Sequence, residues 1–198
     1  ISISNEKLIE EFPEWTVGKI ASKVGVNNRH VAGEQETASD MAVAAANNLF
    51  TVDSDIRRED IDFVLFCTQS PDYFLPTSAC LIQDRLGLRT NIGAIDFNLG
   101  CSGYVYGLAI AKGLITGRIA KNVLLLTAET YSKYLHPRDK GNRTIFGDAS
   151  SASVISTDGF VEIGEFSLGT DGKGADNLIV RTGASRKKEA ENDLSFYE

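Results

Sequence analysis

The chain has 198 residues, a length that suits a medium-sized domain with an extensive buried core. Its formal net charge of −7 argues against non-specific binding to nucleic acid or to an anionic membrane surface. Apolar residues make up 42% and charged residues 24%, no apolar run approaches the roughly 20 residues that a membrane helix requires, and the first residues lack a signal-peptide pattern. We therefore expect a soluble, cytoplasmic protein.

The first fifty residues predict a mostly helical segment. Asn5 suits the N-cap of a first helix, Pro13 the start of a second, and Gly25 the C-terminal end of that second helix. A third, alanine-rich helix follows a Thr-Ala-Ser-Asp sequence. The predicted helices are residues 5–12, 14–24 and 41–50, with a loop at 27–35.

Three short apolar runs further along are typical of strands that are buried on both faces: residues 61–68, 93–98 and 122–129. Helical patterns at residues 77–86 and 105–115 separate them, which predicts a parallel sheet with crossover helices. Ligands gather at the carboxyl ends of such strands. We therefore expect the residues at these ends to line one pocket: Thr68, Gln69, Cys101, Glu129 and Thr130.

The pattern changes after residue 131. A polar loop is predicted at residues 134–143, and further strands, with antiparallel pairing, at 150–156, 159–168 and 177–182. Together the patterns predict an α/β domain of residues 1–184 with a mixed sheet and helices on both faces. Residues 185–192 are charged and have no apolar face to bury, so we expect a mobile segment at residues 185–198.

Cys101 is the candidate nucleophile, because it lies between a predicted strand and a predicted helix in the sequence Gly-Cys-Ser-Gly. Gly100 and Gly103 lack the Cβ atoms that would obstruct a sharp turn, as in a nucleophile elbow. The N-terminus of the following helix would favour the thiolate. The alternative is a buried structural cysteine, the role that we expect for Cys67 and Cys80. The three cysteines lack metal-type spacing, so we expect no metal site and no disulfide framework.

Four sequence blocks carry a family likeness. They are Pro13-Glu14-Trp15 followed by Arg29-His30, residues 75–83 (LPTSACLIQ), residues 98–104 (NLGCSGY) and residues 142–149 (NRTIFGDA). In this order they resemble the N-terminal half of the β-ketoacyl-[acyl-carrier-protein] synthase III family, in the thiolase-like superfamily. The resemblance implies a thiolase-like fold with a mixed five-stranded sheet. The likeness spans roughly residues 5–171.

The resemblance implies an enzyme of fatty acid synthesis whose cysteine takes an acyl group from coenzyme A. A decarboxylative condensation with malonyl-acyl-carrier protein would follow, in a homodimer that needs no cofactor. Cys101 matches the nucleophile and, through its backbone N–H, one oxyanion donor. The resemblance further implies that Trp15 stacks on the coenzyme A adenine and that Lys140 replaces an adenine-contacting arginine. It also implies that Phe146 lines the active-site tunnel and that Leu75 closes the partner's acyl pocket.

Some residues depart from the family pattern or have a second interpretation. Lys19 or Lys23 stands where an arginine for the coenzyme A phosphate is expected. The family's catalytic His and Asn belong to a C-terminal half that this sequence does not include, and the family's opening strand is missing before Ile1. We therefore expect this chain alone to be incomplete for condensation.

Trp15 equally suits packing of its helix against the core. We expect Asp148 to be a turn or cap residue, and two other residues to be structural or solvent-facing: His30 and His136.

Two rival functions stay open at this point. A related acyltransferase of specialised metabolism, or a hydroxymethylglutaryl-type synthase, would share the nucleophile and differ in the acceptor. A non-catalytic dimer partner would supply contacts only, although a pure scaffold does not require a thiol at the turn.

Overall fold

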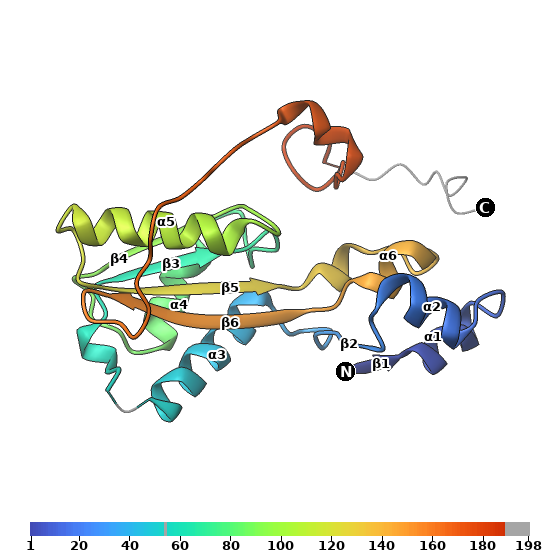
Figure 1. Cartoon of the computed structure of the whole chain (residues 1–198), viewed down its shortest axis with the longest axis horizontal. Helices are drawn as coiled ribbons and strands as arrows, with labels where there is room; N and C mark the ends of the chain where they lie inside the picture. The colour runs from blue at the N-terminus through green and yellow to red at the C-terminus, as the bar shows by residue number, and fades with distance from the viewer. Residues whose placement is uncertain (54, 189–198) are drawn as a thin grey trace.

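The computed structural model of the chain describes residues 1–53 and 55–188. Most of the segment predicted to be mobile, from 189 onward, lies outside the described residues. A central sheet is covered on one face by helix α5 and on the other by helices α3 and α4 (Figure 1). A smaller unit built from the first thirty residues lies at one end of the sheet (Figure 1).

The central sheet has four strands in the order β4-β3-β5-β6. Strands β3 (Phe63–Cys67), β4 (Gly93–Phe97) and β5 (Asn122–Glu129) are parallel, whereas β6 (Ala149–Ser156) runs antiparallel to β5. The mixed sheet was therefore predicted correctly, but the number of strands was not. Among the described residues, β4 and β6 are the two edge strands, and each is paired along one side only.

The side chains of the central strands alternate between two cores, as expected for strands buried on both faces. Val64 and Phe66 of β3 pack with α3 (Ala38–Val52) and α4 (Ser78–Arg85). Leu65 of β3 and Leu125 of β5 pack on the opposite face against α5 (Gly103–Thr116). The crossover helices thus enclose the sheet and leave the carboxyl ends of its parallel strands at one edge.

Caps decide where the helices begin. Thr37 forms a capping box with Asp40 at the start of α3. The carboxylate of Asp96, in β4, accepts the N–H groups of Ser78 and Ala79 at the start of α4, both at 2.7 Å. This contact ties α4 to the strand that leads into the Cys101 turn.

The N-terminal unit corrects the predicted boundaries. Helix α1 (Asn5–Glu11) is capped by Ser4 and not by Asn5, whose side chain instead donates to Val26 O at 3.0 Å. Helix α2 (Val17–Val24) begins later than predicted because Thr16 caps it. The predicted loop at 27–35 contains strand β2 (Asn28–His30), which pairs antiparallel with β1 (Ser2–Ser4).

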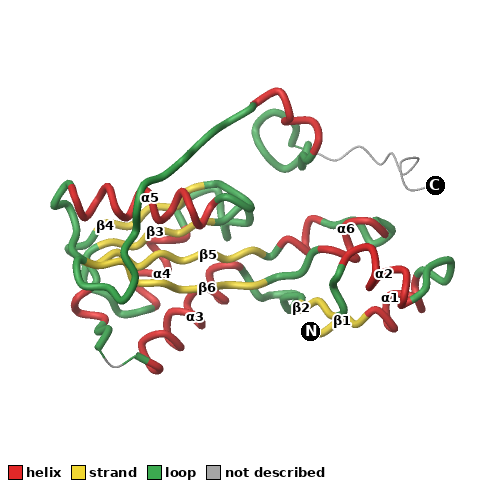
Figure 2. The backbone as a smooth tube through the Cα atoms, in the orientation of Figure 1, coloured by secondary structure: helices red, strands yellow, loops and turns green. Residues whose placement is uncertain are grey.

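Two predicted strands, at residues 159–168 and 177–182, are absent from the structure. The first runs along α5, where the Lys112 ammonium donates to the carbonyl oxygens of Ile163 (2.7 Å) and Gly164 (2.8 Å). The chain then extends away from the sheet into the 3₁₀ helix Gly172–Asn177 (Figure 2). A strand forms only where another strand satisfies its backbone groups, and no sheet edge pairs with these segments.

Candidate active site

The chain turns sharply between the end of β4 at Phe97 and the start of α5 at Gly103, and Cys101 lies in this turn with its side chain exposed. The Gly103 N–H donates to the Gly100 carbonyl at 2.8 Å and closes the turn. The strand-to-helix turn predicted for Cys101 is therefore present.

The two glycines of the turn lie close to the end of β3. A Cβ atom on Gly103 would lie 2.3 Å from the Cys67 sulfur, and one on Gly100 would lie 2.8 Å from Gln69 Oε1. A larger residue at Gly103 requires the buried Cys67 to move, whereas one at Gly100 requires only a shift of the Gln69 side chain. The glycines thus allow the Cys101 turn to pack closely against the neighbouring strand.

The three thiols differ in environment. Cys67 is buried, and burial raises the pKa of its thiol to about 11, with a further contribution from the negative charge of Glu129. Cys101 and Cys80 are exposed. The prediction of a core position is therefore correct for Cys67 and wrong for Cys80. Ala79 and Ile82 form the buried face of α4, and Cys80 lies outside that helical spacing.

The ends of β3 and β5 are joined by hydrogen bonds to Glu129. Its Oε1 accepts the Gln69 N–H at 2.7 Å, and its Oε2 accepts the Ser70 hydroxyl at 2.8 Å. The Ser70 oxygen in turn accepts the Thr130 N–H at 2.9 Å. Gln69, Glu129 and Thr130 therefore meet at one edge of the sheet, and the contact of Gln69 with Gly100 connects them to the Cys101 turn. That these residues line a pocket stays a prediction.

The Glu129 carboxyl is unusual because it is partly buried at a strand end. Burial raises the pKa of Glu129, although its hydrogen bonds from Gln69 and Ser70 act in the opposite direction. Burial also raises the pKa of the neighbouring Tyr134, and the negative charge of Glu129 adds to this effect. The Tyr134 hydroxyl donates to the Gln69 carbonyl at 3.2 Å.

Aromatic side chains lead from Gln69 to Phe146. The rings of Tyr134 and Tyr131 meet edge to face with their centroids 6.2 Å apart, and Tyr131 lies 4.7 Å from Phe146. Phe146 follows helix α6 (Lys140–Ile145) and also lines a hollow of about 290 Å³ beside the N-terminal unit. The hollow is lined by Ile3, Leu8, Glu11, Arg29, Val31, Ser132, Leu135, Pro137, Arg143 and Phe146.

Trp15 and Lys140 belong to facing segments at the outer end of this region. Lys140 forms an ion pair with Glu14, the neighbour of Trp15, and its ammonium lies 5.8 Å from the Phe12 ring centroid. The Lys19 ammonium lies 5.4 Å from the Trp15 ring centroid. The structure therefore brings the predicted ligand contacts Trp15 and Lys140 near one another, in a cluster of cations and aromatic rings.

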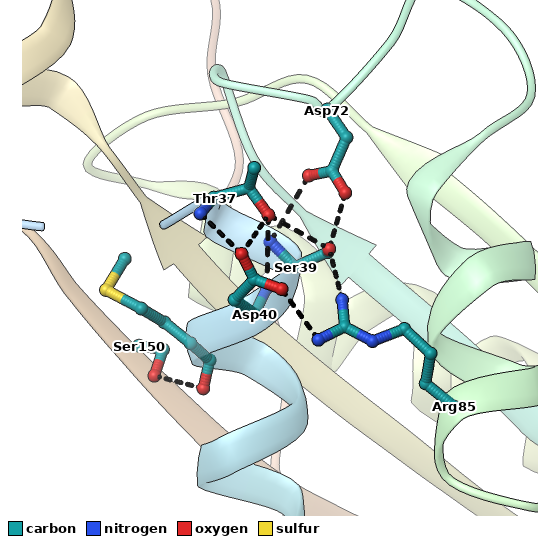
Figure 3. Close-up of polar contacts among 7 residues, drawn as sticks. Thr37, Ser39, Asp40, Asp72, Arg85 and Ser150 are labelled. Carbon is teal, nitrogen blue, oxygen red and sulfur yellow. Dashed lines mark hydrogen bonds and ion pairs between the residues drawn. The ribbon is translucent and has the colours of Figure 1, made fainter. Parts of the chain in front are cut away.

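Leu75 lies on the loop between β3 and α4 and is 82% exposed, beside Phe74, which is 85% exposed. A polar network anchors this loop to α3 (Figure 3). The Ser39 hydroxyl donates to Asp72 Oδ2 at 2.5 Å, while the Arg85 guanidinium donates to Ser39 Oγ at 2.9 Å and to Asp40 Oδ1 at 2.7 Å. The loop is thus tied to α3 through Asp72, and its apolar tip lies in solvent.

Other polar residues have structural roles. Asp148 accepts the N–H groups of Ala32 (2.7 Å) and Ser132 (2.8 Å), which lie 116 and 16 positions away along the chain. It therefore joins distant segments, and the prediction of a local turn or cap residue is wrong. Arg29 is buried and donates to Thr144 O at 2.7 Å and to Asn5 Oδ1 at 2.5 Å. The central role of Glu129 was missed, although a carboxylate that closes an apolar strand was a usable signal. No group of three or more metal-ligating side chains is found in the described residues.

None of the helices formed by residues 1–53 and 55–188 is long and apolar enough to cross a membrane.

Comparison with known proteins agrees with this architecture. The family model 3-oxoacyl-[acyl-carrier-protein] synthase III matches residues 95–172, which include the Cys101 turn. A β-ketoacyl-[acyl-carrier-protein] synthase III from Sulfurovum sp. is 38% identical over 88% of this chain and 51% of that protein. The corresponding protein from Clostridioides difficile is 38% identical over 92% of this chain and 54% of its own length.

A crystal structure of a 3-oxoacyl-(acyl-carrier-protein) synthase III matches with a TM-score of 0.91 and 51% identity, over 98% of this chain and 58% of that one. The fold and the cysteine turn therefore define a protein of the thiolase-like class. Within this class, the chain is similar over most of its own length to β-ketoacyl-[acyl-carrier-protein] synthase III proteins. It spans about half the length of the curated relatives it matches.

Proposed function

We propose that the chain is the acyl-accepting part of a β-ketoacyl-[acyl-carrier-protein] synthase III that starts fatty acid synthesis. The observation that carries the proposal is the exposed Cys101 in a glycine-bracketed turn at the carboxyl edge of the sheet, in a chain similar to this family. Cytoplasmic location and the absence of a cofactor are part of the same proposal.

In the first step, the Cys101 thiolate attacks the carbonyl carbon of an acyl-coenzyme A thioester. A bond forms between this carbon and the Cys101 sulfur, the bond to the coenzyme A sulfur breaks, and coenzyme A leaves as a thiolate that takes up a proton. The charge on the thioester oxygen needs a hydrogen-bond donor in the transition state. The backbone N–H of Cys101 suits this role, since it makes no hydrogen bond among the described residues.

The proposed substrate contacts follow the chain of side chains described above. Trp15 and Lys140 would hold the adenine end of coenzyme A, and Phe146 would line the path to the sulfur. Thr68 and Gln69 would form the wall beside Cys101, a position supported by the contact of Gln69 with Gly100.

Leu75 would enter the acyl pocket of a second copy in a homodimer. Its support is the exposure of an apolar tip on an anchored loop.

In the second step, a malonyl thioester on acyl-carrier protein would lose CO₂, and the carbanion that remains would attack the acyl group on Cys101. The bond to the cysteine sulfur would break as the carbon–carbon bond forms. We assign the His and Asn that guide this step to the rest of the whole protein, because His30 and His136 lie outside the Cys101 turn in this chain.

Intact mass after incubation with acyl-coenzyme A thioesters of increasing chain length tests the first step. We expect one acyl adduct, which is retained in Cys80→Ala and lost in Cys101→Ala. The chain length that reacts fastest would define the donor. An adduct that persists in Cys101→Ala would refute the assignment of the nucleophile, and the absence of any adduct on the folded wild-type chain would refute acyl transfer by this chain.

A further inference from the structure

We propose that Glu129 is a positioning residue for the nucleophile turn: its carboxylate holds the backbone of Gln69, and the Gln69 side chain supports the turn at Gly100. The inference rests on the role of Cys101 proposed above. It assigns a function to a partly buried carboxylate that neither acyl transfer nor the packing of the sheet requires.

The first step of the argument is that Glu129 uses both oxygens on one short segment. Oε1 accepts the Gln69 N–H at 2.7 Å, and Oε2 accepts the Ser70 hydroxyl at 2.8 Å. Hydrogen bonds to a charged acceptor are the stronger kind. Glu129 forms no ion pair among the described residues, so these donors are its main stabilising partners.

The second step is that Gln69 is held from both sides. Its N–H donates a hydrogen bond to Glu129 Oε1, and its carbonyl oxygen accepts one from the Tyr134 hydroxyl at 3.2 Å. Both polar groups of the Gln69 backbone are therefore fixed by side chains from outside β3. These two contacts fix the backbone from which the Gln69 side chain extends.

The third step connects Gln69 to the nucleophile. A Cβ on Gly100 would lie 2.8 Å from Gln69 Oε1 and 3.4 Å from its Cδ, so the amide packs directly on the Gly100 backbone. The Gly100 carbonyl also accepts the hydrogen bond that closes the turn around Cys101. A displacement of Gln69 would therefore loosen the turn and move the Cys101 sulfur from the N-terminus of α5.

Alkylation of Cys101 by iodoacetamide reports this positioning. The thiolate displaces iodide and forms a carbon–sulfur bond, without any need for a coenzyme A site.

In a Cys80→Ser background, the second-order rate constant at Cys101 is measured by intact mass and peptide mapping, well below the melting temperature. We expect Glu129→Gln and Gln69→Ala each to slow the reaction by about 3- to 10-fold, since in a loosened turn the sulfur lies less often beside the free N–H groups at the start of α5. The double variant should react no more slowly than the slower single variant. Glu165→Gln, at an exposed position, is the matched control and should not change the rate.

The outcomes separate positioning from two other roles. A lower melting temperature with an unchanged rate constant would mean that Glu129 is only structural. A faster reaction in Glu129→Gln would mean that its negative charge acts directly on the thiol; either result overturns the proposal. If Glu129→Gln does not fold, Ser70→Ala removes one donor to the carboxylate and should slow alkylation to a smaller extent, and an unchanged rate there overturns the proposal. A chain that shows these rate changes but takes no acyl group from coenzyme A would refute the proposed function alone.

Discussion

Two regions of the chain contain similar apolar patterns and differ in what covers them. In residues 63–156, the strand side chains alternate between two helix-covered cores, and Leu125 is only 1% exposed. In residues 157–188, Leu178 is 64% exposed and the predicted strands are absent. Apolar periodicity therefore predicts structure only where the same chain supplies a partner surface.

The largest expected effect comes from truncating one leucine in each region. Leu125→Ala should lower the free energy of unfolding by about 2–5 kcal/mol, because it leaves a cavity between the sheet and α5. Leu178→Ala should change it by less than about 0.5 kcal/mol. Urea unfolding followed by circular dichroism measures both. Equal losses would show that residues 157–188 are packed in solution.

A smaller loss is expected from adding one methyl group at the nucleophile turn. Gly103→Ala would place a Cβ 2.3 Å from the Cys67 sulfur and should cost about 1–3 kcal/mol. Cys67→Ala should recover most of this loss in the double variant, because the two sites are in direct contact. Gly113→Ala, on the same helix with no atom within 4 Å of the added Cβ, should stabilise the chain slightly. Additive effects at Gly103 and Cys67 would contradict the contact.

A further loss of stability is expected in the packed region at alkaline pH. Burial raises the pKa of Cys67 from 9.0 to about 11, so its thiol stays protonated in the folded chain when the unfolded chain has already released the proton. The contribution of the Cys67 thiol to the free energy of unfolding is fully present below pH 9, and it is lost as the pH rises from 9 to 11. Wild type should therefore lose more stability over this range than Cys67→Ala, measured by urea unfolding at each pH. Parallel curves would show that the thiol is not buried in solution.

The sequence was sufficient where a local rule decides the structure. The apolar runs located β3, β4 and β5 to within two residues, and the glycines beside Cys101 located the turn. These features depend on periodicity and on steric limits within a few residues.

Features that depend on distant partners were not predicted. Strand β2 is short and polar, and its pairing with β1 joins residues 24 to 28 positions apart, such as Ile3 and Arg29. The convergence of Gln69 and Glu129 at one edge was predicted from topology, but their hydrogen bond, across 60 positions, was not. Pairings of this kind depend on the whole fold.

The outer edge of β6 has a consequence for handling the isolated chain. Its eight residues, ASSASVIS, contain no charge and no proline, and on one side their backbone groups have no partner strand among the described residues. Natural sheets protect such edges with lysine, proline or a bulge, because an uncovered edge accepts strands from other molecules. The β6 edge is therefore a route of self-association that is separate from the dimer contact proposed for Leu75.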